Sequence, residues 1–265
     1  MVTQRHHDPI GRIPIVQIAP VVDSGRWAAK AFAGEVIPFG ATVFREGHDA
    51  VGAELLLVDP KGLETVHRMQ LQGQGTDRWQ TQVRLDAMGS YRFVIRAFSD
   101  DFETWHHNTE VKLAAGIDQE LMLLEGIELF QRAAQDMAVA KPVKEFYQRL
   151  AEKLSDKLLS PFERFLLASE PSVREKLAAN PIRSLVTLSA EHIIVCEREL
   201  AGRGAWYEFF PRSEGAKYSA KTKTWTSGTF KTAAKRLPDV KAMGFDVLYL
   251  PPIHPIGRTF RKGPN

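Results

Sequence analysis

The spacing of hydrophobic positions changes twice along the chain, and the first segment has the pattern of β-strands. From residue 13 to residue 114, short runs of β-branched and aromatic residues are separated by turn signals such as Asp59-Pro60-Lys61-Gly62. Residues 79–85 place Trp79, Val83 and Leu85 on one face and polar side chains on the other, as in a half-buried strand. We expect strands at Ile13–Ala19, Val36–Phe44, Ala53–Asp59, Trp79–Leu85, Tyr91–Phe98 and Thr109–Ala114. Residues 1–115 are thus predicted to form an immunoglobulin-like antiparallel β-sandwich.

Residues 116–203 follow a helical period instead. Val143, Phe146, Tyr147, Leu150 and Leu154 recur at spacings of three and four, which is typical of one face of a helix. Prolines suit the first turn of a helix, and they recur through this segment at Pro142, Pro161, Pro171 and Pro181. The last helix is expected to carry Leu185, Leu188, His192, Val195 and Glu199 and to end at Gly202. We predict a bundle of four or five helices, either inserted between its neighbours or standing beside them.

Residues 204–265 predict a third kind of structure, with strand, helix and strand in turn. Ala205–Pro211 is a compact aromatic strand, Thr229–Met243 has a helical pattern ending at Gly244, and Asp246–Pro252 is almost continuously apolar. Such a strand is covered on both faces, as in parallel sheets, so the order indicates a βαβ unit. The fold class predicted for the whole chain is therefore multidomain, with β, α and α/β parts.

The charge of the chain is concentrated in its last quarter. The net charge is only +3, but residues 201–265 hold 12 Lys and Arg against 4 Asp and Glu. Such an excess indicates an anionic ligand, an acidic partner or an acidic segment of the same domain that lies outside this sequence. The chain has a single cysteine, Cys196, so an intrachain disulfide is excluded. We predict that Cys196 is a small buried hydrophobic residue. The polar start lacks the apolar core of a secretory signal, and no apolar run reaches the roughly 20 residues of a membrane helix. We therefore expect a cytoplasmic protein without a membrane partner.

Several candidate binding signals have simpler explanations. The pairs His6-His7 and His106-His107 lack the ligand spacing of zinc sites, so we predict no metal and no cofactor. The lysine-rich segment with Tyr218 and Trp225 lacks a nucleic-acid module, so we predict no nucleic acid. His254 is expected to pack in a loop, and His192 to be a hydrogen-bonded interior residue. Sugar stacking by aromatic residues of the sandwich remains an alternative to a core role; the candidates are Trp79, Tyr91 and Trp105.

The last 60 or so residues carry four ordered motifs, WYEFFPRS, GTF, GFDVLYLPPIHPIG and RKGPN. Together they resemble the entry into the catalytic barrel of the α-1,4-glucan:maltose-1-phosphate maltosyltransferases, a family of the α-amylase clan. The upstream order of strands and then helices is similar to that family's N-terminal sandwich and inserted helical domain. The resemblance implies that residues 204–265 begin a (β/α)8 barrel, which takes about 250 residues. The chain is then expected to be the front portion of a longer protein.

The resemblance also implies a reaction. The family transfers maltosyl units from α-maltose 1-phosphate to the non-reducing end of an α-1,4-glucan, with retention and release of phosphate. It uses an Asp nucleophile, a Glu acid/base and a supporting carboxylate, one group attacking the sugar and another protonating the leaving group. These groups follow later barrel strands, so no catalytic residue is assigned within the chain. Glu208, Asp239 and Asp246 are not substitutes, because they lie within the predicted strands and helix.

Two residues match the family's sugar-contacting loop. Lys262 corresponds to the lysine of RKGPN that helps to hold the maltosyl donor, and Asn265 falls in the same loop; both are candidate substrate-binding residues. A solvated loop charge at Lys262 is the alternative. The resemblance further implies a homodimer, formed by surfaces outside the barrel. The competing function is a non-catalytic dimerisation or glucan-binding scaffold.

Overall fold

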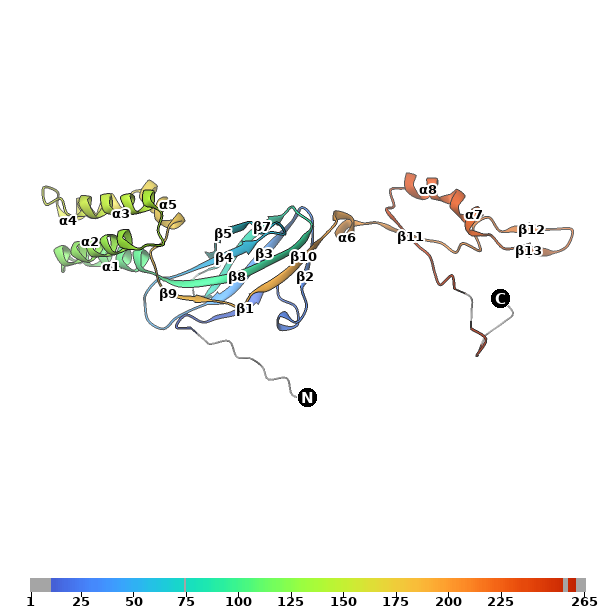
Figure 1. Ribbon diagram of the computed structural model, residues 1–265, viewed down its shortest axis with the longest axis horizontal. Helices are drawn as coiled ribbons and strands as arrows, with labels where there is room; N and C mark the ends of the chain where they lie inside the picture. Colours follow the sequence, from blue (N-terminus) through green and yellow to red (C-terminus); the bar gives the residue numbers. More distant parts are fainter. Residues whose placement is uncertain (1–10, 74, 255–256, 261–265) are drawn as a thin grey trace. The chain divides into compact units, whose positions relative to one another are not determined.

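The chain folds into two compact units, Met1–Cys196 and Glu197–Asn265 (Figure 1). The computed structural model describes residues 11–73, 75–254 and 257–260. Several β-sheets and helices are present in these ranges, which confirms the prediction of mixed β and α parts.

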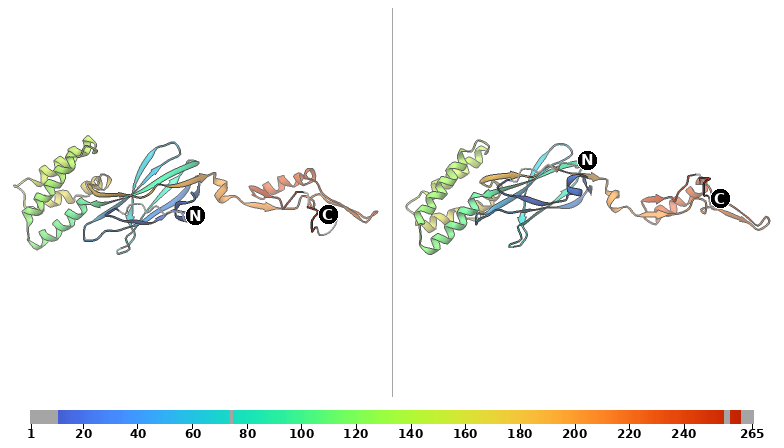
Figure 2. Two further views of the ribbon diagram at one scale, coloured as in Figure 1. Left: turned by 60° about the horizontal axis from the view of Figure 1, so that its bottom comes forward. Right: turned by 90° about the horizontal axis from the view of Figure 1, so that it is seen from below.

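The first unit contains two β-sheets that share a hydrophobic core, and Figure 2 shows them as layers. One sheet has the order β1-β3-β7-β6 and the other β2-β10-β8-β4-β5, with β9 also paired to β8. The strands of the first sheet are β1 (Ile15–Ala19), β3 (Glu35–Val43), β6 (Gln70–Leu71) and β7 (Arg78–Leu85). Those of the second are β2 (Ala29–Phe32), β4 (Val51–Val58), β5 (Glu64–Arg68), β8 (Gly89–Asp100), β9 (Arg183–Leu188) and β10 (His192–Glu197).

Alternation along the strands builds this core. On β8, Tyr91, Phe93, Ile95 and Ala97 are all buried and point into the core, because every second residue of a strand shares a face. Phe93 meets Phe39 of β3 edge to face, with ring centroids 5.1 Å apart. The two sheets are thus held together by residues that a period of two predicts.

A helical insertion separates β8 from β9 in the sequence. It consists of α1 (Asp101–Ala115), α2 (Gln119–Gln135), α3 (Lys141–Leu154), α4 (Pro161–Ser169) and α5 (Pro171–Ala179). Proline lies in the first turn of α3, α4 and α5, as expected of a residue that lacks an amide hydrogen. The apolar faces of the helices enclose a second core, which includes Phe102, Trp105, Phe130, Tyr147 and Phe165.

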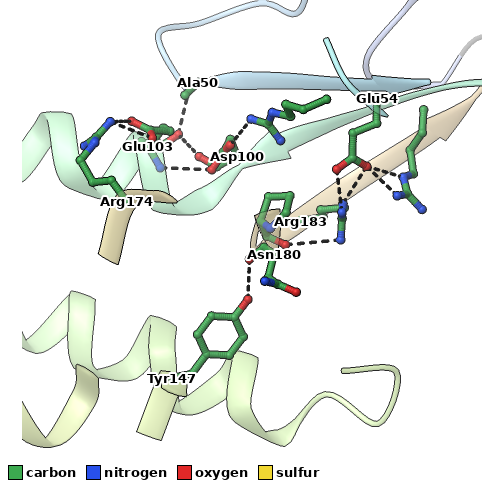
Figure 3. Close-up of polar contacts among 12 residues, drawn as sticks. Ala50, Glu54, Asp100, Glu103, Tyr147, Arg174, Asn180 and Arg183 are labelled. Carbon is green, nitrogen blue, oxygen red and sulfur yellow. Dashed lines mark hydrogen bonds and ion pairs between the residues drawn. The ribbon is translucent and has the colours of Figure 1, made fainter. Parts of the chain in front are cut away.

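Buried carboxylates hold both connections between the sheet and the insertion (Figure 3). On β4, Glu54 is 2% exposed and accepts hydrogen bonds from Arg183 of β9 at 2.7 Å and from Arg96 of β8 at 2.8 Å. At the end of β8, Asp100 caps α1 by accepting the Glu103 amide at 3.2 Å, and it also accepts Arg68 at 2.7 Å. The chain is therefore fixed by ion pairs where it leaves the sheet and where it returns.

The electrostatics of Glu54 follow from these contacts. Burial raises the pKa of Glu54, but the hydrogen bonds and charges of Arg183 and Arg96 outweigh it and hold the pKa below its ordinary value of 4.5. Tyr147 of α3 donates to the Asn180 carbonyl at 2.6 Å next to β9, and burial raises the pKa of Tyr147 to about 12. Glu54 is thus ionised and Tyr147 protonated at neutral pH.

Two predicted elements are wrong. Thr109–Ala114 is the second half of α1 rather than a strand, because the Asp100 cap starts a helix whose buried residues Phe102, Trp105, Thr109 and Leu113 follow a helical period. The helix expected across Leu185–Glu199 is instead β9 and β10. In β10 the buried positions alternate, with Ile194 and Cys196 in the core. Helices α1–α5 therefore lie within residues 101–179 rather than 116–203.

The second unit contains the predicted strand, helix and strand. β11 (Trp206–Glu208) pairs in parallel with β14 (Val247–Tyr249), and the helical stretch between them is α7 (Phe230–Ala233), the 3-10 turn η2 (Ala234–Arg236) and α8 (Leu237–Ala242). Gly244 follows with a left-handed φ of 89°, as predicted for a helix end. The lysine-rich segment after β11 forms a hairpin of β12 (Lys217–Ser219) and β13 (Thr224–Thr226).

The remaining elements are short. The 3-10 turn η1 spans Asp23–Gly25, and α6 spans Glu199–Arg203. Among the described residues, no helix has both the length and the apolar character that crossing a membrane requires.

Candidate functional site

The candidate functional site of the second unit lies at the carboxyl ends of β11 and β14. The parallel register pairs Trp206 with Val247 and Glu208 with Tyr249, so both strands end at the same edge. In parallel α/β folds, ligands bind at this edge because the connecting loops meet there.

A cavity of about 320 Å³ opens at this edge. The loop after β11 and the loop after β14 line it together with the start of α7: Phe210, Pro211, Arg212, Gly228, Thr229, Phe230, Pro251, Pro252 and Ile253. Phe210 is 60% exposed and Phe230 59%. The lining is therefore apolar and accessible, and Arg212 is its one charged side chain among the described residues.

Close backbone packing fixes the loop after β11. The Gly228 amide donates to the Arg212 carbonyl at 2.7 Å, and a Cβ on Gly228 would lie 2.0 Å from the Glu214 carbonyl oxygen. Only glycine fits such an approach. Thr229 then caps α7, its side chain accepting the Thr232 amide at 3.3 Å while the Thr232 hydroxyl donates to the Glu214 carbonyl at 3.1 Å.

Arg212 is the chemically distinctive group of this cavity. Its guanidinium makes no ion pair or hydrogen bond with any residue that the structure describes. Arginine carries five donors in a planar fork that suits phosphate, carboxylate and hydroxyl oxygens. The cavity thus combines apolar surface with a cationic donor, a combination that suits a sugar or a phosphorylated sugar.

Comparison with known proteins assigns the chain to a family. A family description, alpha-1,4-glucan:maltose-1-phosphate maltosyltransferase, domain N/S, matches residues 11–198, which is most of the chain. The chain belongs to this maltosyltransferase family.

Relatives in the family match both units. Alpha-1,4-glucan:maltose-1-phosphate maltosyltransferase 1 of Streptomyces coelicolor is 46% identical over 257 residues, covering 97% of this chain. The second such protein of that organism is 47% identical over 257 residues, and the one from Mycobacterium tuberculosis is 37% identical over 287 residues, covering 96% of this chain. The chain spans only 37% of the length of the two Streptomyces proteins and 39% of the Mycobacterium protein.

The structure gives the positions of only some of the polar residues considered in the sequence analysis. Lys262 and Asn265 lie outside the described residues. His254 follows β14 with an exposed side chain. Asp239 pairs with Arg236 at 3.2 Å, and Asp246 accepts the Ala205 amide at 3.1 Å, so both carboxylates have structural partners.

The aromatic residues weighed for sugar stacking in the sandwich are core residues. Tyr91 is 4% exposed, and its hydroxyl accepts the Ala87 amide at 3.0 Å. Trp79 packs against the sandwich core and donates to the Val43 carbonyl at 3.3 Å. Trp105 belongs to α1 rather than to the sandwich, and it donates to the Met122 carbonyl at 2.7 Å. A core role is confirmed for Tyr91 and Trp105, while Trp79 is half-buried against the sandwich core.

The histidine and cysteine signals have structural explanations as well. No group of three potential metal ligands occurs in the described ranges; His6 and His7 lie outside them. His106 packs between Phe102 and Phe165 and contacts the Ser169 hydroxyl at 2.9 Å. His192 is half-buried on β10 rather than on a helix, with its ring 5.3 Å from that of Phe93. Cys196 is buried, as predicted.

Proposed function

We propose that the chain is the N-terminal part of a retaining maltosyltransferase, which transfers maltosyl units from α-maltose 1-phosphate to the non-reducing end of α-1,4-glucans. In this reaction, a carboxylate attacks the anomeric carbon and phosphate leaves with a proton from a second carboxyl group. That group then takes the proton of the acceptor hydroxyl, whose oxygen attacks the anomeric carbon and displaces the first carboxylate as the glycosidic bond forms. Both carboxyl groups belong to the part of the longer protein beyond residue 265.

The family match over residues 11–198 is the observation that carries this proposal. The relatives, whose names state the same transfer, extend the match through the second unit. The parallel pair β11 and β14 supports an assignment of this unit as the first βαβ segment of a (β/α)8 barrel. The two sheets with their shared core support an immunoglobulin-like sandwich that carries the helical insertion.

Lys262 and Asn265 are proposed to contact the sugars of the donor from the loop after β14. An ammonium group donates up to three hydrogen bonds, which suits the hydroxyls of a maltosyl unit. The longer enzyme is proposed to be a cytoplasmic homodimer that needs no cofactor, with dimer contacts outside the barrel.

The test is phosphate release from α-maltose 1-phosphate in the presence of a maltooligosaccharide. We expect release by the longer protein that contains this sequence and none by the 265-residue chain alone. Lys262→Ala in the longer protein should raise KM for the donor or lower kcat. Release by the short chain would contradict the placement of the carboxylates. Absence of release by the longer protein would favour the non-catalytic scaffold.

A further inference from the structure

The loop that leaves the carboxyl end of β11 carries a hairpin whose role the family match does not assign. Strands β12 and β13 pair Lys217 with Thr226, Tyr218 with Trp225, and Ser219 with Thr224. Figure 1 shows the hairpin as a ribbon that projects from the second unit next to α7. The hairpin and the Arg212 cavity therefore belong to the same connection, between β11 and α7.

An exposed aromatic pair dominates this hairpin. Tyr218 and Trp225 lie directly opposite each other, with ring centroids 5.3 Å apart and planes inclined by 48°. Tyr218 is 53% exposed and Trp225 70% exposed. A cross-strand aromatic pair stabilises a hairpin, but here a large apolar surface on each ring is left in water. By contrast, Tyr207 and Phe245 of the same unit, 5.0 Å apart, pack against its core.

The hairpin also carries hydrogen-bond donors. Lys217, Lys221 and Lys223 are exposed, and no described residue forms an ion pair or a side-chain hydrogen bond with their ammonium groups. Residues 217–227 contain no acidic residue, whereas hydroxyl groups occur at Ser219, Thr222, Thr224, Thr226 and Ser227. The hairpin thus combines two apolar ring faces with donors that are not engaged with carboxylates.

This combination matches a carbohydrate chain. A pyranose ring presents an apolar face of CH groups, which packs on an aromatic ring, and a rim of hydroxyls, which accept hydrogen bonds from ammonium groups. Consecutive glucosyl rings of an α-1,4-linked chain are inclined to each other because the chain curves. Two rings inclined by 48° can therefore face neighbouring glucosyl units, whereas the parallel stack of nucleic-acid bases fits them poorly.

We propose that the β12–β13 hairpin binds the α-1,4-glucan chain, with Trp225 and Tyr218 stacked on neighbouring glucosyl units and Lys221 and Lys223 of the turn donating to sugar hydroxyls. The inference rests on the proposed function, which supplies the glucan as the acceptor. It assigns to the connection after β11 a role in holding the acceptor chain.

The test is a titration of the isotope-labelled 265-residue chain with maltoheptaose, followed by amide chemical shifts. Saturable shifts should be largest at residues 217–226, and nuclear Overhauser spectra of the same sample should show cross-strand contacts between the rings of Tyr218 and Trp225. Trp225→Ala should raise Kd on the order of tenfold, while Trp225→Phe should retain most of the affinity. Trp27→Ala is the matched control, because Trp27 is 60% exposed in the first unit, and it should leave Kd unchanged.

Several results would overturn the proposal. These are a lack of saturable shifts, shifts centred elsewhere in the chain, a missing contact between the two rings, or equal binding by the Trp225→Ala protein. Salt-sensitive binding of oligo(dT) at the hairpin that maltoheptaose cannot displace would instead identify a nucleic-acid site. Phosphate release by the longer protein is measured separately, so an error in the proposed reaction and an error in the hairpin assignment give different results.

Discussion

Glu54 shows how a single buried charge can determine the geometry around it. Its carboxylate is the shared acceptor of Arg96 and Arg183, which lie on the strands before and after the helical insertion. Glu54→Gln removes the charge but retains the shape, leaving two arginines without their counterion. We expect the free energy of unfolding of the first unit to fall by about 3 kcal/mol, the scale of a broken buried ion pair. Denaturant titration of the full chain measures this change.

Asp86→Asn is the matched control for that substitution. Arg84 and Asp86 are separated by 2.7 Å, but their side chains are 66% and 73% exposed, so the loss should be under about 1 kcal/mol. The wild-type stabilisation by Glu54 should also disappear at low pH. Because the folded pKa lies below 4.5, this contribution is complete above the unfolded pKa and is lost as the pH falls through the folded pKa. Equal losses for the two variants would contradict the role given to Glu54.

His106 makes the insertion sensitive to mild acid. Burial lowers the pKa of His106 below 6.5, and the nearby charge of Arg174 lowers it further. Below pH 6.5, His106 therefore binds a proton more readily in the unfolded chain than in the folded chain. The free energy of unfolding falls as the pH drops towards the folded pKa. We expect the Tm difference between pH 7.5 and pH 5.5 to shrink in His106→Gln. It should persist in His107→Gln, because the neighbouring His107 is exposed; a loss there instead would contradict the prediction.

Residue types that act through local chemistry could be predicted from the sequence, whereas single functional side chains could not. The prolines at the starts of α3, α4 and α5, Gly244 and the buried Cys196 are confirmed, because backbone restriction or apolarity alone decides them. Pro181 instead lies between α5 and β9. Arg212 could not be predicted, because a single arginine in a polar loop forms no recognisable sequence motif. The cavity around it depends on Pro251 and Phe230, which only the fold brings near. Lys262 and Asn265 stay predictions.

At the scale of elements, long alternating strands were predicted well and short or returning ones poorly. The strands found as β1, β3, β4, β7 and β8 are confirmed, since each combines β-branched or aromatic residues with flanking turn residues. β5 (Glu64–Arg68) was missed because its side chains are half-buried or exposed. β9 and β10 were misread as a helix because their apolar residues happen to recur at spacings of three and four. Their pairing with β8 is a long-range contact that local pattern cannot show.

The loop between β11 and α7 makes an element-scale prediction. In Gly228→Ala, the new methyl group would meet the carbonyl oxygens of Glu214 and Pro211, which belong to the backbone and cannot swing away. We expect the second unit to lose roughly 1–3 kcal/mol, as for other overpacked sites, with faster amide exchange at residues 209–229. Gly257→Ala is the control, because nothing lies within 4 Å of its Cβ position. Similar exchange rates in the two variants would show that the close approach at Gly228 is not present.

At the scale of the whole molecule, the two units differ in how much core they contain. The first unit has two extensive hydrophobic clusters, one in the sandwich and one in the insertion. The second has a small cluster whose buried members are Phe209, Ala233 and Val240, and it leaves Trp206 63% exposed. Since stability follows the apolar area removed from water, the second unit should be much the less stable of the two.

Unfolding of the chain should therefore occur in two steps. We expect residues 197–265 to unfold at a lower denaturant concentration, reported by tryptophan fluorescence in a chain that keeps Trp206 and Trp225 as its only tryptophans. A polypeptide of residues 11–196 should unfold in one cooperative step, at the same midpoint as the second transition of the full chain. A single transition for the full chain, or a lower midpoint for residues 11–196 alone, would show that the first unit depends on the second. In the longer protein, the proposed barrel would cover the exposed apolar edge of β11 and merge the second unit into a larger cooperative core.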